Sequence, residues 1–70
     1  METSFLLLNL ATRVKKLRLA KGVSQEEANN ATGIHFGRLE QGKRDVSFTT
    51  LYKIADYFEL SLTEFLSEGF

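Results

Sequence analysis

The chain has 70 residues, a length that fits one domain over residues 1–70, and its formal net charge is zero. It contains no cysteine and a single histidine, which excludes disulfides and thiolate metal sites, so we expect no metal and no cofactor. The apolar run Phe5-Leu6-Leu7-Leu8 is too short to span a bilayer and lacks the flanks of a signal peptide, so we expect no membrane contact and a cytoplasmic location.

The first predicted helix covers about residues 6–21. Apolar residues recur along it at steps of three and four residues, the spacing of one helix face. They are Leu7, Leu10, Val14 and Leu17. Gly22 follows as a left-handed cap, and the arginines and lysines of this segment fall on the other face.

Two short helices are predicted next. Ser24-Gln25-Glu26-Glu27 has the form of a capping box, in which serine and glutamate satisfy each other's backbone amides, and it opens a helix that ends near Ala31. Gly33 suits the turn that follows. A third helix is expected over residues 34–41, before Gly42 ends it.

Two more helices complete the chain. Ser47 caps the fourth, whose apolar residues follow the spacing i, i+3, i+4, i+7. These are Leu51, Ile54, Ala55 and Phe58. Ser61-Leu62-Thr63-Glu64 is a second capping box and opens a last helix, with Phe65 and Leu66 facing inward beside Leu62. The pattern therefore predicts an all-α fold of five helices with no strand.

The charges are unevenly distributed along the chain. Residues 1–44 hold eight Lys/Arg and four acidic residues, a net of +4, whereas residues 45–70 have a net of −4. One interpretation is an ordinary solvated mixture of charges. The other is a basic face opposite an acidic one, which would suit a protein that binds phosphates.

Four segments of the chain form a recognisable set: Arg13-Val14-Lys15-Lys16-Leu17-Arg18, Gly22-Val23-Ser24-Gln25-Glu26-Glu27, Arg38-Leu39-Glu40-Gln41-Gly42-Lys43-Arg44 and Ser47-Phe48-Thr49-Thr50-Leu51. In this order they resemble the phage-repressor and Cro-like helix-turn-helix family. Residues 61–66 are similar to that family's last helix, and the resemblance covers about residues 10–66. It implies a compact, lambda-repressor-like domain of five helices with its helix-turn-helix at residues 24–42. Such domains usually bind a palindromic operator as symmetric dimers, and the third helix contacts base edges.

The resemblance also implies roles for residues on both sides of the third helix. Ser24 and Gln25 match positions that hold a DNA phosphate at the start of the second helix, where the helix dipole favours an anion. Gln41, Lys43 and Arg44 match a loop that lies along the other side of the groove. These contacts would position the protein on DNA without selecting a sequence.

Arg18 and Glu40 match a pair that forms a largely buried salt bridge in the family. The bridge ties the first helix to the end of the third. Such a pair is structural, so neither residue is expected to contact DNA.

The chain departs from the family between its second and third helices. Gln25 and Glu40 are 15 positions apart, about three fewer than is usual, so the motif is short by nearly one helical turn. The missing residues fall between Thr32 and Gly37. Either the turn or the third helix is shorter, and Thr32 and Ile34 are candidates for base contacts in this shortened segment.

Four further residues of this segment each have two possible roles. His35 either donates to a guanine or phosphate or stands at an exposed helix start. Phe36 is predicted to lie in the core rather than against a thymine methyl. Gly37 permits a close approach, either of the DNA backbone or of the second helix. Arg38 is the predicted base contact, because a guanidinium can pair with guanine O6 and N7 together, and its alternative is a phosphate contact.

Both ends of the chain are more apolar than one small core requires. Two copies must meet if both third helices are to reach half-sites about one DNA turn apart, so we predict a homodimer whose interface comes from the ends. The candidates are Phe5, Leu6, Leu8, Phe65, Leu66 and Phe70.

The predicted function is that of a transcriptional regulator, most simply a repressor, which binds double-stranded DNA as a homodimer on a short inverted repeat. The alternative is a protein-interaction module with the same fold, such as an antitoxin or a small partner-binding subunit. Enzymatic activity is not expected, because no nucleophile-base pair, carboxylate pair or phosphate-binding glycine loop is present in the sequence.

Overall fold

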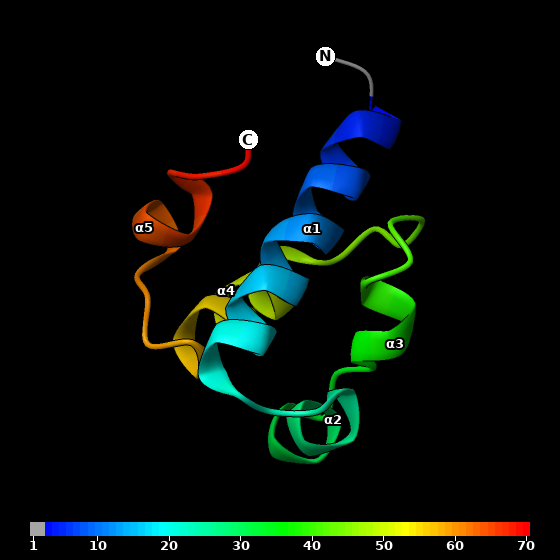
Figure 1. Cartoon of the computed structure of the whole chain (residues 1–70). Helices are drawn as coiled ribbons and strands as arrows, with labels where there is room; N and C mark the ends of the chain where they lie inside the picture. The colour runs from blue at the N-terminus through cyan, green and yellow to red at the C-terminus, as the bar shows by residue number, and fades with distance from the viewer. Residues whose placement is uncertain (1–2) are drawn as a thin grey trace.

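The computed structural model describes residues 3–70, which form five helices and no β-strand (Figure 1). The helices are α1 (Thr3–Lys21), α2 (Gln25–Thr32), α3 (Phe36–Leu39), α4 (Phe48–Tyr57) and α5 (Leu62–Leu66). The all-α prediction with five helices is therefore confirmed. None of these helices combines the length and hydropathy that crossing a bilayer requires.

Helix α1 is the longest helix of the molecule. Its 19 residues extend about 28 Å at 1.5 Å per residue, close to the longest dimension of 32 Å. It begins three residues earlier than predicted, because Thr3 and Ser4 do not interrupt a helix even though they precede the apolar pattern. It ends as predicted: Gly22 has a φ of +77°, its N–H donates to Leu19 O at 3.1 Å, and the Val23 N–H donates to Arg18 O at 3.3 Å.

Both predicted capping boxes are present. The Glu27 N–H donates to Ser24 Oγ at 3.0 Å and the Ser24 N–H donates to Glu27 Oε1 at 2.9 Å. At α5 the matching distances are 3.1 Å from Glu64 N to Ser61 Oγ and 2.9 Å from Ser61 N to Glu64 Oε1. Each helix start therefore has two backbone amides satisfied by local side chains.

We expect these capping boxes to make stability depend on acid pH. The backbone hydrogen bond from Ser24 lowers the pKa of Glu27, and that from Ser61 lowers the pKa of Glu64. A carboxyl with a lowered pKa stabilises the fold above its unfolded pKa, and this contribution is lost as the pH falls through the folded pKa. The urea midpoint should therefore fall between about pH 5 and about pH 3.

The control for this prediction is the double variant Glu27→Gln, Glu64→Gln, which keeps an acceptor at both positions but does not titrate. Its urea midpoint should fall less over the same pH range than that of the natural chain. An equal fall in both proteins would show that other carboxyls cause the acid sensitivity.

The core joins all five helices. Its fully buried side chains include Val14 from α1, Ala28 from α2, Phe36 from α3, Ile54 from α4 and Phe65 from α5. Phe36 was predicted to lie in the core, and this is confirmed. Phe65 was predicted at the dimer interface, and this is wrong, because its side chain has no exposed surface to offer a partner.

The other terminal apolar residues are exposed, but they do not form one patch. Leu66, predicted to face inward, is 40% exposed, and the Phe70 ring lies 6.3 Å from that of Phe65 between ring centres. Leu6 lies two turns before Arg13 on the flank of α1 that faces α5, whereas Leu8 lies beside Gly42 on the opposite flank, where a Cβ on Gly42 would stand 2.7 Å from Leu8 Cδ2. The N-terminal end of α1 and the C-terminus lie at the same end of the molecule (Figure 1).

Arg13 links α1 to the end of α5, a role that the sequence did not reveal. Its guanidinium is buried: Nε donates to Phe65 O at 3.0 Å, Nη2 to Glu64 O at 3.3 Å, and Nη1 to Glu68 at 3.2 Å. It also lies 5.7 Å from the centre of the Phe65 ring. The guanidinium thus satisfies carbonyls at the C-terminal end of α5, and Arg13 does not belong to the exposed basic face on which the sequence placed it.

Gly42, in the loop between α3 and α4, gives a prediction with a matched control. Gly42 and Gly22 both have a φ of +77°, so Gly→Ala at either position should destabilise the fold by about 1 kcal/mol through backbone strain. A methyl group at Gly42 would also lie 2.7 Å from Leu8 Cδ2, whereas a methyl group at Gly22 would meet nothing within 4 Å.

Gly42→Ala should therefore lower the free energy of unfolding by about 0.5–1.5 kcal/mol more than Gly22→Ala, because Leu8 must leave its rotamer. Urea unfolding measures both variants. Adding Leu8→Ala should remove the difference, and equal effects of the two single changes would show that Leu8 moves without strain.

Candidate nucleic-acid interface

The start of α2 is built around Ser24 and Gln25. Ser24 is the N-cap, and the first-turn amides of α2 point outward along the helix axis, as in any α-helix. The Gln25 side chain turns toward α3, where Nε2 donates to Glu40 Oε1 at 3.2 Å. The side chain of Gln25 is therefore held by the protein, and its backbone N–H faces outward.

The turn between α2 and α3 consists of Gly33, Ile34 and His35. Gly33 has a φ of +76° and its N–H donates to Asn29 O at 2.8 Å, which closes α2. The Thr32 hydroxyl donates to Ala28 O at 2.7 Å and accepts from the Ile34 N–H at 3.1 Å. Because this hydroxyl holds the turn and the Ile34 side chain packs against the core, neither residue lies with the exposed side chains of α3.

Helix α3 is a single turn of four residues, Phe36–Leu39, and not the eight residues predicted over 34–41. The preceding turn has three residues, which is normal for a helix-turn-helix. The shortening that the sequence left unassigned therefore falls in α3. Gly37 consequently lies in the first turn of α3, where its missing side chain leaves room for those of His35 and Gln25: a Cβ would stand 3.1 Å from His35 Cε1.

Side chains from outside α3 hold this short helix in place. Asn29 Oδ1, from α2, accepts the Phe36 N–H at 2.6 Å, and His35 Nδ1 accepts the Arg38 N–H at 3.1 Å. Phe36 and Leu39 are buried beneath it. The sequence analysis did not predict this role of Asn29.

The hydrogen bond at His35 also determines the form of its ring. An imidazole nitrogen that accepts a hydrogen bond carries no proton, so the neutral ring has its proton on Nε2. The exposed His35 ring can therefore cap α3 with one nitrogen and donate from the other. The sequence analysis offered two roles for His35, as an exposed helix start and as a hydrogen-bond donor to guanine or phosphate. This geometry is compatible with both.

Arg18 and Glu40 form a bidentate ion pair behind α3. Arg18 Nε donates to Glu40 Oε2 at 2.7 Å and Nη2 donates to Oε1 at 3.1 Å, with side chains that are 9% and 4% exposed. Arg18 Nη1 donates to Val23 O at 2.9 Å. The hydrogen bond to Glu40 raises the pKa of Arg18. The pair thus joins α1, the entry to α2 and the end of α3, and neither charge faces outward.

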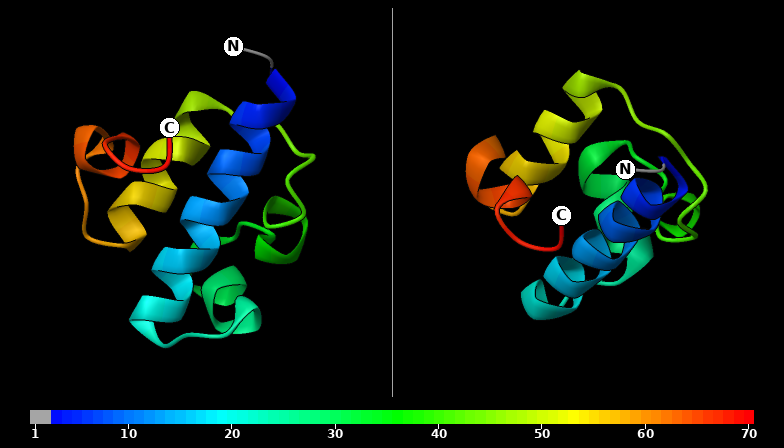
Figure 2. Two further views of the ribbon diagram at one scale, coloured as in Figure 1. Left: turned by 45° about the horizontal axis from the view of Figure 1, so that its top comes forward. Right: turned by 90° about the horizontal axis from the view of Figure 1, so that it is seen from above.

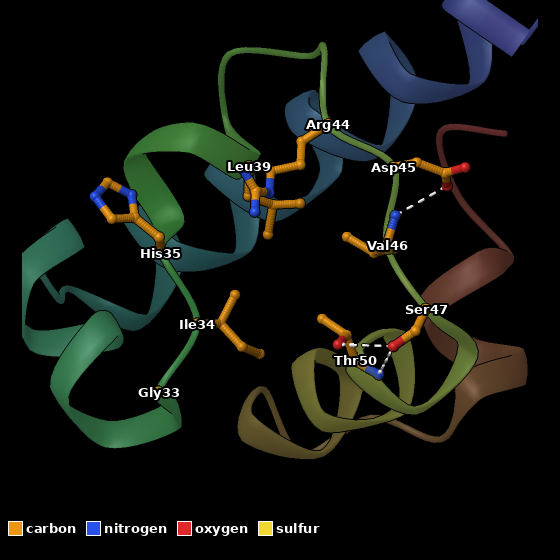
Figure 3. Close-up of a pocket in the computed structure, with 9 residues that line it drawn as sticks. All are labelled: Gly33, Ile34, His35, Leu39, Arg44, Asp45, Val46, Ser47 and Thr50. Atoms are coloured by element: carbon orange, nitrogen blue, oxygen red, sulfur yellow. Dashed lines mark hydrogen bonds between the residues drawn. The ribbon is translucent and has the colours of Figure 1, made fainter.

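Four polar side chains remain on the exposed side of α3 and its following loop, and together we call them the basic head. They are Arg38, Gln41, Lys43 and Arg44, which surround one shallow depression. Beside it lies a hollow between the α2–α3 turn and the α3–α4 loop, into which the Arg44 side chain extends toward Leu39 while the His35 ring points away (Figure 3). The basic head therefore carries three positive charges next to His35.

The comparison with protein families decides what this arrangement is. The family model described as helix-turn-helix matches residues 14–65, from the middle of α1 to the end of α5. The chain belongs to the Cro- and phage-repressor-type helix-turn-helix family. No curated protein and no solved structure shows a significant match. Membership supports the role of a DNA-binding transcriptional regulator.

In this helix-turn-helix protein, α2 and α3 are the two helices of the motif. Figure 2 shows α2 and α3 together on one side of α1, with α4 and α5 on another. The shortened α3 is the helix that the family uses in the major groove. Within residues 3–70, no three His, Asp or Glu side chains come together as a metal site would require.

Proposed function

We propose that this helix-turn-helix regulator binds a short inverted repeat of double-stranded DNA in a sequence-specific manner, as a homodimeric repressor. The observation that carries the proposal is the basic head on the exposed side of an α3 that Asn29, His35 and a buried Phe36 hold in place. A fixed, positively charged helix end is suited to a groove lined with phosphates.

Base contacts come from Arg38 and His35. Arg38 is exposed on the only turn of α3, and its guanidinium can pair with guanine O6 and N7. His35 presents an Nε2–H beside it, which can donate to guanine or to a phosphate. Thr32 and Ile34 are omitted from this proposal, because they form the turn.

Phosphate contacts come from both flanks of α3. On one side, the Ser24 hydroxyl and the Gln25 backbone N–H stand at the positive end of the α2 dipole. On the other side, Gln41, Lys43 and Arg44 follow α3. A half-site contacted from both flanks fixes the orientation of α3 in the groove.

The dimer contact that we propose uses Leu6 near the start of α1, Leu66 at the end of α5 and Phe70 at the C-terminus, which are 39–42% exposed. Chains of this length bury only about 60% of their unfolded surface, so contact with a second copy would bury further apolar surface and stabilise the fold. A dimer that covers a promoter excludes polymerase, which is the simplest form of repression. Such a role places the protein in the cytoplasm of a bacterial or phage-infected cell and requires no catalysis.

The experiment is to select duplexes from a random pool and to measure affinity by fluorescence anisotropy at several salt concentrations. Arg38→Ala should weaken binding to the selected site by about 1–3 kcal/mol and relax base preference. Lys43→Ala should weaken binding to all duplexes alike and lower the salt slope by about 1. Lys16→Ala, a matched change on α1 away from the basic head, should leave binding unchanged.

Two results would contradict the proposal. If no duplex binds in a salt-dependent way, the alternative of a protein-interaction module such as an antitoxin is favoured. If sedimentation shows a monomer at high micromolar concentration, and on the selected duplex as well, the homodimer is wrong while DNA binding can still stand.

A further inference from the structure

The outward side of α1 carries a stripe of three large apolar side chains that the fold leaves at least half exposed. Phe5, Leu8 and Leu19 are 59%, 50% and 60% exposed. With Thr12 and Lys15 they follow the alternating spacing of three and four residues that keeps side chains on one helix face. In the view of Figure 1 the other helices lie beside and behind α1. We call this surface, together with Lys16, the α1 face.

The α1 face lies opposite the buried side of the same helix. Leu10 and Val14 point into the core, so α1 carries large apolar side chains on its outward side as well as on its buried side. Phe5 and Leu8 lie one turn apart, and Leu19 lies about 16 Å further along the axis, beyond Thr12 and Lys15. These apolar side chains stay in contact with water unless another molecule covers them.

A hollow beside the stripe offers a place for a side chain of that molecule. It is lined by Glu40 at the end of α3 and by six residues of α1, which are Leu8, Ala11, Thr12, Lys15, Lys16 and Leu19. Both carboxylate oxygens of Glu40 accept hydrogen bonds from Arg18, so this acid is neutralised. The hollow therefore combines apolar side chains with two lysines and has no unpaired negative charge from Glu40.

The charge of the α1 face indicates what binds there. Residues Thr3–Lys21 contain no acidic residue, and Lys15 and Lys16 lie on the exposed face, while Arg13 and Arg18 are turned inward. The face thus combines an apolar stripe with positive charge alone. Its complement is an apolar stripe bordered by aspartate or glutamate.

A second copy of the chain does not fit this requirement. If two α1 helices paired antiparallel around Thr12, Leu19 would meet Phe5, but the two Lys15 side chains would lie about 9 Å apart along the axis with Lys16 beside them. Four lysines would then share one Debye length, about 10 Å at 0.1 M salt, with no acid from α1. DNA would neutralise the lysines but would leave the apolar stripe in water.

We propose that the α1 face binds an amphipathic helix of a partner protein, whose apolar stripe is bordered by acidic residues. This goes beyond DNA binding, because the α1 face shares no residue with the basic head. The regulator can therefore hold DNA and the partner at the same time, which would bring the partner to the operator.

The test uses two synthetic helical peptides with the same leucine stripe, one bordered by glutamates and the other by lysines, and measures their binding to the full chain by anisotropy. The glutamate peptide should bind with a micromolar Kd and the lysine peptide at least about tenfold more weakly. Leu19→Ser should weaken binding of the glutamate peptide about tenfold. Tyr52→Ser, a matched loss of an exposed apolar side chain on α4, should have no effect.

A charge reversal makes the test sharper. The double variant Lys15→Glu, Lys16→Glu should reverse the preference and bind the lysine peptide more tightly. Thermal melts of each variant should match that of the natural chain, because the changed side chains are exposed. DNA affinity should be unchanged in Leu19→Ser, which separates this proposal from the proposed function.

Three results would overturn the proposal. The first is equal affinity for both peptides, or an affinity for the glutamate peptide that Leu19→Ser does not change. The second is a dimer that Leu19→Ser converts to a monomer in sedimentation, since the face would then bind a second copy. The third is displacement of the peptide by random duplex or by anionic vesicles, since the face would then bind nucleic acid or lipid.

Discussion

Replacing Glu40 with alanine is expected to lower the free energy of unfolding by about 3–5 kcal/mol, because the change leaves the Arg18 guanidinium buried without its partner. Arg18 is 9% exposed and donates two hydrogen bonds to Glu40, so water cannot readily take the place of the lost carboxylate. A 70-residue domain has a total stability of roughly 4–10 kcal/mol. The variant should therefore be partly unfolded at 37 °C, as urea unfolding and thermal melts followed by circular dichroism would show.

The control is a double change that removes both charges of the pair. The double variant Arg18→Met, Glu40→Leu should retain much more stability than Glu40→Ala, because a buried ion pair adds little over apolar groups of similar volume. Arg18→Ala should lower the melting temperature and weaken DNA binding only through unfolding. A variant of Arg18 that is stably folded yet no longer binds DNA would show that this residue takes part in the interface itself.

The features that the sequence predicted correctly depend on neighbouring residues. A capping box joins residues three apart, and the glycine after α1 closes the last turn of the same helix. Such contacts are encoded within a few positions, so the starts of α2, α4 and α5 and the end of α1 were found at or within a residue of their places. The fold class followed from these boundaries.

The features that the sequence missed depend on residues far apart in the chain. Arg13 hydrogen-bonds to Phe65, 52 positions away, so nothing local distinguishes it from the exposed lysines of α1. The length of α3 is likewise determined from outside, by Asn29 before it and by Glu40, whose carboxylate is tied to Arg18. A pattern of apolar residues and glycines over 34–41 cannot show these constraints.

The candidate site was predicted unevenly for the same reason. Long charged side chains are rarely buried unless they are paired. The residue type alone therefore predicted that Arg38, Lys43 and Arg44 would be exposed, as they are. Thr32 is different, because its hydroxyl is short enough to bond to the backbone of its own turn. A threonine at a turn therefore predicts local structure better than it predicts a base contact.

Phe36→Ala should weaken DNA binding, because the buried Phe36 side chain packs α3 against the core. The Phe36 ring is fully buried and makes edge-to-face contacts with Tyr57 and Phe58, with ring centres 6.2 Å apart in each case. Its removal should lower the free energy of unfolding by about 3–5 kcal/mol. It should also release α3, since a helix of four residues has too few hydrogen bonds to persist without tertiary contacts.

The matched control is Ile54→Ala, because Ile54 is equally buried but belongs to α4. It should lower stability by about 2–5 kcal/mol while Phe36 still holds α3 against the core. Both variants are compared at a temperature where each is mostly folded, with affinity for the selected duplex corrected for the folded fraction. Phe36→Ala should then bind at least about tenfold more weakly than Ile54→Ala, whereas equal corrected affinities would mean that Phe36 supports DNA binding only through global stability.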